Sequence, residues 1–247
     1  MFGRTITVIG AAGGVGTTTI AVTLARFASR RGGNIFLLDA AEESIVPLYL
    51  GAGRAISGVS AGWSFLPHPE SRQGVISVVA CGDAAAGGDH SPWNRARNLG
   101  GASHDTLIDS GSHRYLDCSP EIVHNTTSLV ILSPDIRSVL QVRHIERKFA
   151  GRDANSLPLY LLNQFHSEIP LHQEVRASLS NHLGDRLAPM TVRDAREVPL
   201  ALSEGLTVVD YAPDSPVASD IVHVADWLLR SAMFDAQPKQ SAAVAGL

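Results

Sequence analysis

The most informative stretch of the chain is TITVIGAAGGVGTTT, which covers residues 5–19. Its first five residues are all β-branched, as in a buried strand, and a glycine-rich turn then leads into a helix. Glycines let successive backbone N–H groups point inward, and a helix start adds partial positive charge, so main chain alone can cradle phosphates. A hydroxyl at the helix start can then ligate magnesium, and Thr18 occupies that position. The segment therefore predicts a phosphate-binding loop.

The same segment departs from the common P-loop pattern GxxxxGK[ST] at two positions. Ala11 stands where the first glycine belongs, and Thr17 stands where the phosphate-binding lysine belongs. A glycine-rich turn between a strand and a helix also occurs in Rossmann-type folds and in tight connections without a ligand. The segment alone leaves these alternatives open.

Beyond this segment, short β-rich apolar runs alternate with longer stretches of helical periodicity. Such alternation is typical of parallel strands joined by crossover helices. We expect strands over residues 5–9, 34–38, 74–80, 105–108, 128–132, 158–162 and 187–192. The predicted fold class is α/β, with a mostly parallel sheet flanked by helices on both faces.

The first helix is expected directly after the glycine-rich turn. Ile20, Leu24 and Phe27 recur at the spacing of one apolar helix face. The glycine pair at residues 32–33 should end this helix.

Composition indicates one large domain and a short tail. With 247 residues, of which 45% are apolar, the chain can bury one large core. We expect a P-loop nucleotide-binding domain over residues 1–234 and a flexible tail over residues 235–247, which has no apolar face and little charge. Residues 51–101 are rich in Gly, Ala, Ser and Pro, so long surface connections with one strand are expected there.

Charge and hydropathy argue against several kinds of partner. The net charge of −4 gives no global field that would hold nucleic acid, so no nucleic-acid partner is expected. The apolar stretch among the first residues is too short for the core of a signal peptide. No later apolar stretch is long enough to cross a bilayer. Two cysteines without a CxxC motif fit a reducing compartment. These features predict a cytoplasmic protein without direct membrane insertion.

Two aspartates follow apolar strand-like runs. Asp39 closes IFLL and Asp109 closes TLI, so both carboxylates should lie at the carboxyl edge of a parallel sheet, beside the phosphate loop. Each could singly be a strand-end turn former. Together with Thr18 they predict a magnesium-nucleotide site.

At these residues the sequence resembles the MinD/ParA family of deviant P-loop ATPases. That family's loop reads KGGVGKTT where this chain reads AGGVGTTT at residues 12–19. The resemblance continues in LLDA at 37–40, LID at 107–109, LLN at 161–163, VRDA at 192–195 and ADWLL at 225–229. Within the family, the GGVGTTT form is most similar to the BcsQ-type proteins of bacterial cellulose synthesis.

The resemblance implies ATP and Mg²⁺ as ligands. The residues that it places around the phosphates are Gly13, Gly14, Val15, Gly16, Thr17, Thr18 and Thr19. Among these, it implies that Thr18 ligates magnesium together with Asp109 and that Thr19 contacts the α-phosphate.

Three further positions match family residues around the nucleotide. Asp39 is expected at the γ-phosphate as the catalytic carboxylate, and Asn163 is expected to contact adenine. Arg193 falls in the loop that borders the base and ribose in the family. A strand-ending polar residue at 163 and a solvated arginine at 193 are the alternatives.

Departures from the family pattern set the expected function. The family's signature lysine, which reaches the partner's phosphates across a dimer, is replaced by Ala12, and the second lysine by Thr17. The acidic residue that many members carry two positions beyond Asp39 is replaced by Ala41. We therefore expect ATP binding with very slow hydrolysis or none.

The implied context is bacterial cellulose synthesis. The expected partners are cellulose synthase subunits at the inner membrane and a second copy of the chain in a nucleotide-dependent homodimer. One alternative is an active MinD/ParA-type positioning or partitioning ATPase, against which the missing lysines argue. The second alternative is a nucleotide-free scaffold.

Overall fold

A computed structural model of the protein describes residues 5–41, 45–51, 62–65, 76–80, 105–114, 126–153 and 156–234. Along these residues the elements are β1 (Thr5–Gly10), α1 (Thr17–Arg30), β2 (Ile35–Asp39), η1 (Val46–Leu50), β3 (Gly62–Phe65), β4 (Ile76–Ala80), β5 (Asp105–Asp109), β6 (Thr127–Leu132), α5 (Ile136–Lys148), β7 (Leu159–Leu162), α6 (Pro170–Leu183), η3 (Gly184–Arg186), α7 (Glu197–Ser203), α8 (Val208–Tyr211) and α9 (Pro216–Phe234).

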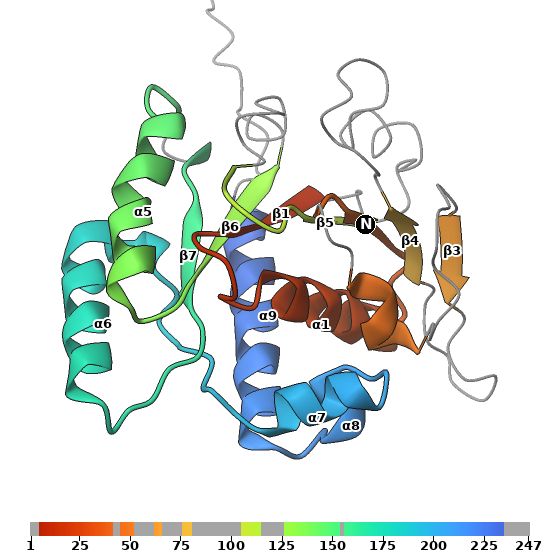
Figure 1. Ribbon diagram of the computed structural model, residues 1–247. Coiled ribbons are helices and arrows are strands. Elements are labelled where there is room, and N and C mark those ends of the chain that lie inside the picture. The colour runs from red at the N-terminus through yellow and green to blue at the C-terminus, as the bar shows by residue number, and fades with distance from the viewer. Residues whose placement is uncertain are drawn as a thin grey trace, which may run out of the picture.

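One sheet of seven strands forms the centre of the fold (Figure 1). The strand order is β3-β4-β2-β5-β1-β6-β7. All neighbouring pairs are parallel except β3 with β4, which is antiparallel and lies at one edge. The carboxyl ends of β1, β2 and β5 therefore meet at one edge of the sheet, and this edge carries the candidate site.

Helices cover both faces of the sheet, as the sequence predicts. Side chains of β6 alternate between two cores: Leu129 and Ile131 pack with α1 and α9 on one face, while Val130 and Leu132 pack with α5 and α6 on the other. Both cores consist of buried aliphatic and aromatic side chains. The continuous apolar run of β6 follows from this two-sided burial.

Helix α1 begins and ends near the residues that the sequence indicates. Its buried stripe includes Ile20 and Leu24, which face the sheet. The helix ends at Arg30, and Gly32 follows with a φ of 86°; the next amide, Gly33 N, donates to Ala28 O at 3.1 Å. This pattern satisfies the last helical carbonyls, and the positive φ explains the glycine.

The structure corrects one expected strand and adds another. Residues 187–192 do not form a strand. Leu187 makes an isolated bridge to Tyr160, Ala188 N donates to Tyr160 O at 2.8 Å, and Val192 N donates to Leu162 O at 2.9 Å. Pro189 interrupts this segment, and proline has no N–H to donate to a ladder. Strand β3, within the region expected to be mostly loop, was not anticipated.

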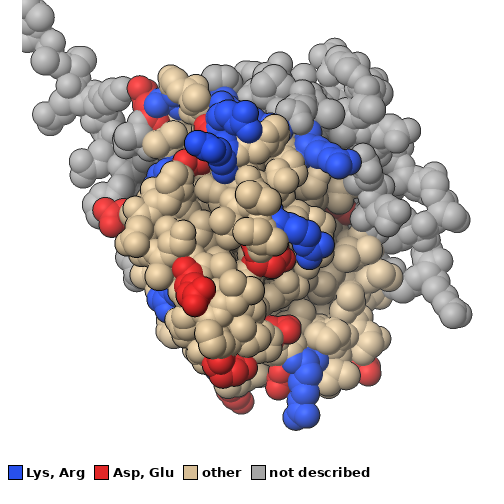
Figure 2. Space-filling view, turned by 60° about the vertical axis from the view of Figure 1, so that its left-hand side comes forward, with Lys and Arg blue, Asp and Glu red and all other residues tan. Residues whose placement is uncertain are grey.

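The proposed tail at residues 235–247 and much of the expected loop region at 51–101 lie outside the described residues. Among the helices that are described, none combines the length and apolarity needed to span a bilayer. On the face shown in Figure 2, acidic and basic side chains both occur, separated by large uncharged areas.

Candidate functional site

The glycine-rich loop connects β1 to α1 and is held in a tight curve. Gly14 and Gly16 have φ values of 78° and 87°, which favour glycine. A Cβ on Gly10 would collide with the Thr17 hydroxyl and with the carbonyl of Gly111. On the β6 side, Ala11 N donates to Ile131 O at 3.0 Å. Position 10, where the loop leaves β1, thus has no room for a side chain.

The backbone N–H groups of the loop form an open row of donors. No described residue accepts a hydrogen bond from the N–H groups of residues 13–19, whereas Ile20 N closes the first helical turn on Gly16 O at 3.0 Å. Gly13 and Gly14 are solvent-exposed. Unpaired N–H groups in a glycine-rich turn at a helix start are the donor set that binds phosphate.

The three threonines at the helix start have different surroundings. Thr17 is buried, with its hydroxyl beside Gly10. Thr18 lies close enough to Asp109 to lower the pKa of that carboxyl. The Thr19 hydroxyl shares a 2.7 Å hydrogen bond with the phenol of Tyr49, a buried residue of η1.

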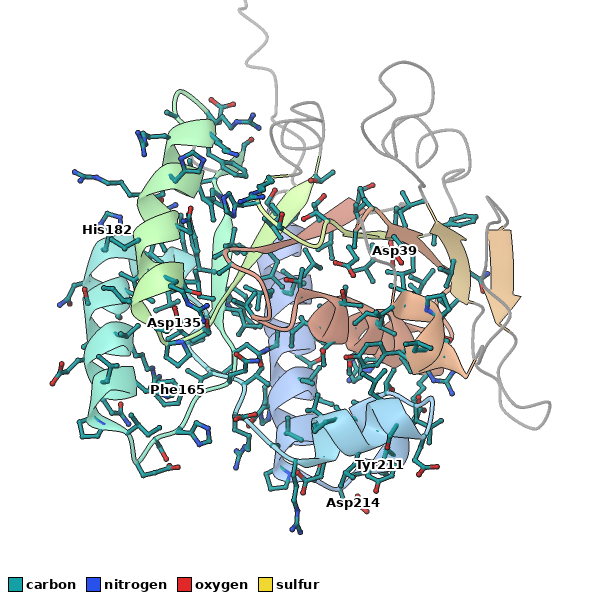
Figure 3. All side chains as sticks on the ribbon, viewed as in Figure 1. Asp39, Asp135, Phe165, His182, Tyr211 and Asp214 are labelled. Atoms are coloured by element: carbon teal, nitrogen blue, oxygen red, sulfur yellow. The ribbon has the colours of Figure 1, made fainter. Side chains whose placement is uncertain are left out.

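Asp39 and Asp109 lie side by side at the ends of β2 and β5. They are paired in the parallel register, and both are almost fully buried, at 2% and 0% exposure. Each Oδ1 accepts a hydrogen bond from the backbone two residues further on, Ala41 N at 3.1 Å and Gly111 N at 3.0 Å. Figure 3 shows Asp39 well inside the molecule, far from the lower edge where Tyr211 and Asp214 lie.

Burial of this carboxylate pair is costly without a cation. The pKa of Asp109 is raised to about 6, mainly by burial and also by the negative charge of Asp39, against the lowering effect of hydrogen bonds from Thr18 and Gly111. Asp109 Oδ2 is buried and has no hydrogen-bond partner within the described part of the chain. A hydroxyl and a carboxylate with an unused oxygen are the oxygen donors that Mg²⁺ prefers, so these residues fit a magnesium ion.

A cavity of about 140 Å³ adjoins the loop on its other side. Its lining comes from the start of α1, the end of β7, the segment after Val192, and α7 and α9. Asn163 and Arg193, which the resemblance assigns to the surroundings of the base, both line this cavity. Arg193 is bound to Asp220 by two hydrogen bonds of 2.6 and 2.9 Å, so its charge is already compensated.

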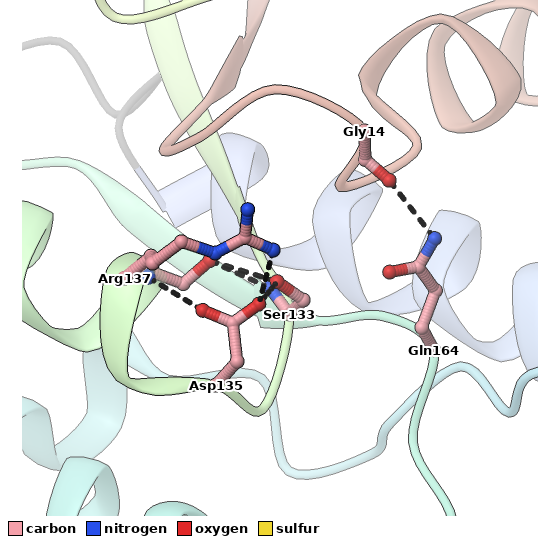
Figure 4. A network of polar contacts seen from close by, with 6 residues as sticks. Gly14, Ser133, Asp135, Arg137 and Gln164 are labelled. Carbon is pink, nitrogen blue, oxygen red and sulfur yellow. Dashed lines mark hydrogen bonds and ion pairs between the residues drawn. The ribbon is translucent and has the colours of Figure 1, made fainter.

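Asn163 has a contact that the sequence did not reveal. Its side-chain Nδ2 donates to Val15 O at 2.8 Å, in a buried position. The next residue, Gln164, donates from Nε2 to Gly14 O at 2.9 Å (Figure 4). Both amides thus bind the carbonyl side of the phosphate loop.

Figure 4 also shows the start of α5 near this loop. Asp135 caps that helix, since its Oδ1 accepts from Ser138 N at 3.0 Å and its Oδ2 accepts from the Ser133 hydroxyl at 2.7 Å. The exposed guanidinium of Arg137 lies 3.4 Å from the same carboxylate.

The sequence patterns indicate the loop and both aspartates, but they do not indicate Tyr49, Gln164 or His113. His113 N donates to Gly10 O at 2.8 Å, at the base of the loop. Burial lowers the pKa of its imidazole, which also faces the charges of Lys148 and His144. None of these three residues belongs to a local pattern, because each reaches the loop from a distant part of the chain.

Comparison with known proteins agrees with this architecture. Residues 6–208 match the family described as CobQ/CobB/MinD/ParA nucleotide binding domain. No curated protein sequence matches the chain at a significant level.

Solved structures of this type superpose over most of the chain. The ParA family ATPase from Chlorobium tepidum has a TM-score of 0.68 and 14% identity, with 92% of this chain and 98% of that chain covered. The septum site-determining protein MinD from Pyrococcus horikoshii, solved with Mg-ADP, gives 0.65 and 17%, with 95% and 99% covered. A chain of the MinC:MinD cell division protein complex of Aquifex aeolicus gives 0.69 and 16%, with 92% and 96% covered.

Proposed function

The chain belongs to the CobQ/CobB/MinD/ParA nucleotide-binding domain family, and from this premise we propose that it binds ATP with Mg²⁺ and hydrolyses it very slowly or not at all. The observation that carries the proposal is the row of N–H groups over residues 13–19, which no described residue accepts, beside the buried pair of Asp39 and Asp109. Donors without acceptors, together with the buried Asp109 Oδ2, which has no hydrogen-bond partner among the described residues, fit an anionic ligand with its metal ion.

Each end of the proposed ligand has its own residues. The backbone of Gly13, Gly14, Val15 and Gly16 wraps the phosphates, with Thr17 at the helix start. The hydroxyl of Thr18 and the carboxylate of Asp109 hold the magnesium ion, whose charge supplies electrostatic stabilisation to the phosphates when it is bound.

Three side chains act around this cradle. Thr19 contacts the α-phosphate, for which its hydroxyl must reorient from Tyr49 or share that hydrogen bond. Asp39, which lies beside Asp109, occupies the γ-phosphate end as the catalytic carboxylate. On the cavity side, Asn163 meets adenine with the oxygen of its amide, because its nitrogen is bound to Val15 O.

Arg193 completes the base side of the site. It lines the cavity while its guanidinium is held by Asp220. We therefore assign it to the wall around the base and ribose and not to the neutralisation of phosphate charge.

Slow hydrolysis follows from the residues at 12 and 17. Cleavage needs positive charge where the transition state spreads negative charge, and one such residue can be worth roughly 10³–10⁵ in rate in related P-loop enzymes. Ala12 and Thr17 provide none, and the Thr17 hydroxyl is buried beside Gly10. Binding depends on main chain and magnesium, so loss of one ammonium should weaken it by only about 1.5–3 kcal/mol.

The test is calorimetry with Mg-ATP alongside a phosphate-release assay. The parent should bind and release phosphate barely above background, whereas Thr18→Ala and Asp109→Ala should bind far more weakly. Ser203→Ala, an exposed hydroxyl on α7 away from the site, serves as a control that should bind like the parent.

Each contrary result selects another function. Turnover comparable to active MinD-type enzymes would favour a positioning or partitioning ATPase. Absence of binding in the parent would favour a nucleotide-free scaffold. Unchanged affinity in both site variants would show that the assigned metal ligands are wrong.

We further propose a role in bacterial cellulose synthesis, supported by the resemblance of the GGVGTTT loop to BcsQ-type proteins. Here the chain forms a nucleotide-dependent homodimer, resides in the cytoplasm, and reaches the inner membrane through cellulose synthase subunits, without nucleic acid or direct insertion. Co-purification with the synthase that depends on ATP would support this role. Equal recovery with and without nucleotide would contradict a nucleotide-dependent association with the synthase.

A further inference from the structure

The carboxamides of Asn163 and Gln164 bind two successive carbonyls of the glycine-rich loop. Asn163 Nδ2 lies 2.8 Å from Val15 O, and Gln164 Nε2 lies 2.9 Å from Gly14 O. The two amides follow β7 directly, and Figure 4 shows the Gln164 amide reaching the loop at Gly14.

These contacts determine where the loop's donors point. In a trans peptide unit the C=O and the following N–H point in opposite directions, and the described residues contain no cis peptide bond. Holding Gly14 O therefore aims Val15 N–H away from β7. Holding Val15 O does the same for Gly16 N–H. Neither N–H group has an acceptor among the described residues.

Gly16 is matched to this arrangement. Its φ is 87°, and a Cβ at this position would collide with Asn163 Nδ2. The Asn163 amide can therefore approach the loop this closely only because residue 16 has no side chain.

The backbone of Gln164 indicates that its side chain has a role. Its φ of 57° is the only positive value at a non-glycine residue in the described ranges. A side chain in the left-handed region costs free energy that glycine would not. Strained positions of this kind concentrate at ligand sites.

We propose that Gln164 is a positioning residue for nucleotide phosphates: with Asn163, it clamps the loop carbonyls so that Val15 N–H and Gly16 N–H face the phosphates. This inference rests on the proposed function and deepens it. The clamp fixes the geometry of the loop. This matters here because position 17 is a threonine, so no lysine at that position binds the phosphates.

The test separates phosphate positioning from contact with the base, because Gln164 also lines the cavity. Mg-ATP and inorganic triphosphate with magnesium are titrated into the parent and into Gln164→Gly and Gln164→Glu. Gln164→Gly should lose about 3- to 10-fold in affinity for both ligands, because the released loop must then be ordered when the phosphates bind. Gln164→Glu places a carboxylate against Gly14 O and should lose more than about 10-fold for both.

Stability gives a readout that a merely structural role would not produce. Gln164→Gly relieves the left-handed strain and increases unfolded-state freedom by comparable amounts, so its Tm should stay close to that of the parent while binding falls. The matched control is Gln173→Glu, since Gln173 Nε2 also donates to a backbone carbonyl, Ser167 O, at 2.9 Å, but away from the loop. It should bind both ligands like the parent.

Backbone ¹⁵N relaxation without any ligand provides an independent arm. Order parameters of Val15 and Gly16 should fall from the rigid range near about 0.85 toward about 0.6 in Gln164→Gly. Weaker ATP binding with unchanged triphosphate binding would make Gln164 a base contact and overturn the proposal, as would unchanged order parameters. If the parent binds neither ligand, the proposed function fails, and the order parameters alone decide whether the clamp exists.

Discussion

Replacing Asp109 by asparagine should stabilise the protein without nucleotide and at the same time remove its response to Mg-ATP. The pKa of Asp109 is about 6 in the folded chain against an ordinary 3.8. Because the folded pKa is raised, the unfolded state loses this proton more readily, and stability falls as pH rises from about 4 to about 6. Above that window the ionised carboxylate costs the folded protein about 3 kcal/mol.

The net gain in the variant is smaller than this cost. Asparagine keeps an oxygen for the Gly111 N hydrogen bond, but its nitrogen takes the place of Oδ2, which has no partner among the described residues. A buried unpaired amide costs about 1 kcal/mol or more. We therefore expect Asp109→Asn to raise the free energy of unfolding by about 2 kcal/mol near pH 7.5, and by about a third of that at pH 5.

Urea unfolding at both pH values, with a chelator and then with Mg-ATP, measures both effects. At a concentration of about 100 times Kd, Mg-ATP should stabilise the parent by about 2.7 kcal/mol, and it should stabilise Asp109→Asn hardly at all. Asp105→Asn, at the opposite end of the same strand, should keep the nucleotide response. A variant that is less stable than the parent at pH 7.5 without nucleotide would refute the argument, because burial of an uncompensated charge would then not be the dominant effect.

Two further substitutions test the loop from other sides. Gly16→Ala meets both a φ of 87° and the Asn163 amide, so it should destabilise by about 1–3 kcal/mol and abolish Mg-ATP binding; a normal Tm with normal affinity would contradict the loop geometry. Tyr49→Phe leaves the Thr19 hydroxyl without its partner and should lower stability by about 1 kcal/mol. If Thr19 serves the α-phosphate, thermal shift should show a larger Mg-ATP stabilisation in Tyr49→Phe than in the parent, and an equal or smaller one would contradict that role.

The parts of the fold that sequence predicts are those coded locally. The β-branched run before the glycine turn and the two-sided apolar run of β6 specify strands by themselves. The segment at 187–192 is not a strand because Pro189 has no backbone N–H to donate to a neighbouring strand. The apolar periodicity that predicted this strand does not take such a missing donor into account. The amide of Gln164 reaches a loop 150 positions earlier in the chain, and no local pattern codes for such a contact.

Binding without turnover makes the proposed site a conformational ligand site. A nucleotide that is cleaved slowly can shift an equilibrium only through differential affinity for two states. The groups that would supply this difference lie on separate elements: the loop N–H groups on β1–α1, Asp109 on β5 and the carboxamides after β7. Binding of the phosphates and the metal ion between these groups would link the three strand ends. It would also compensate the buried negative charge of Asp109. Restoring lysine by Thr17→Lys alone should therefore tighten binding without restoring hydrolysis, since Ala12 still leaves the partner's phosphates without a cation; substantial turnover in that variant would show that position 17 alone limits the chemistry.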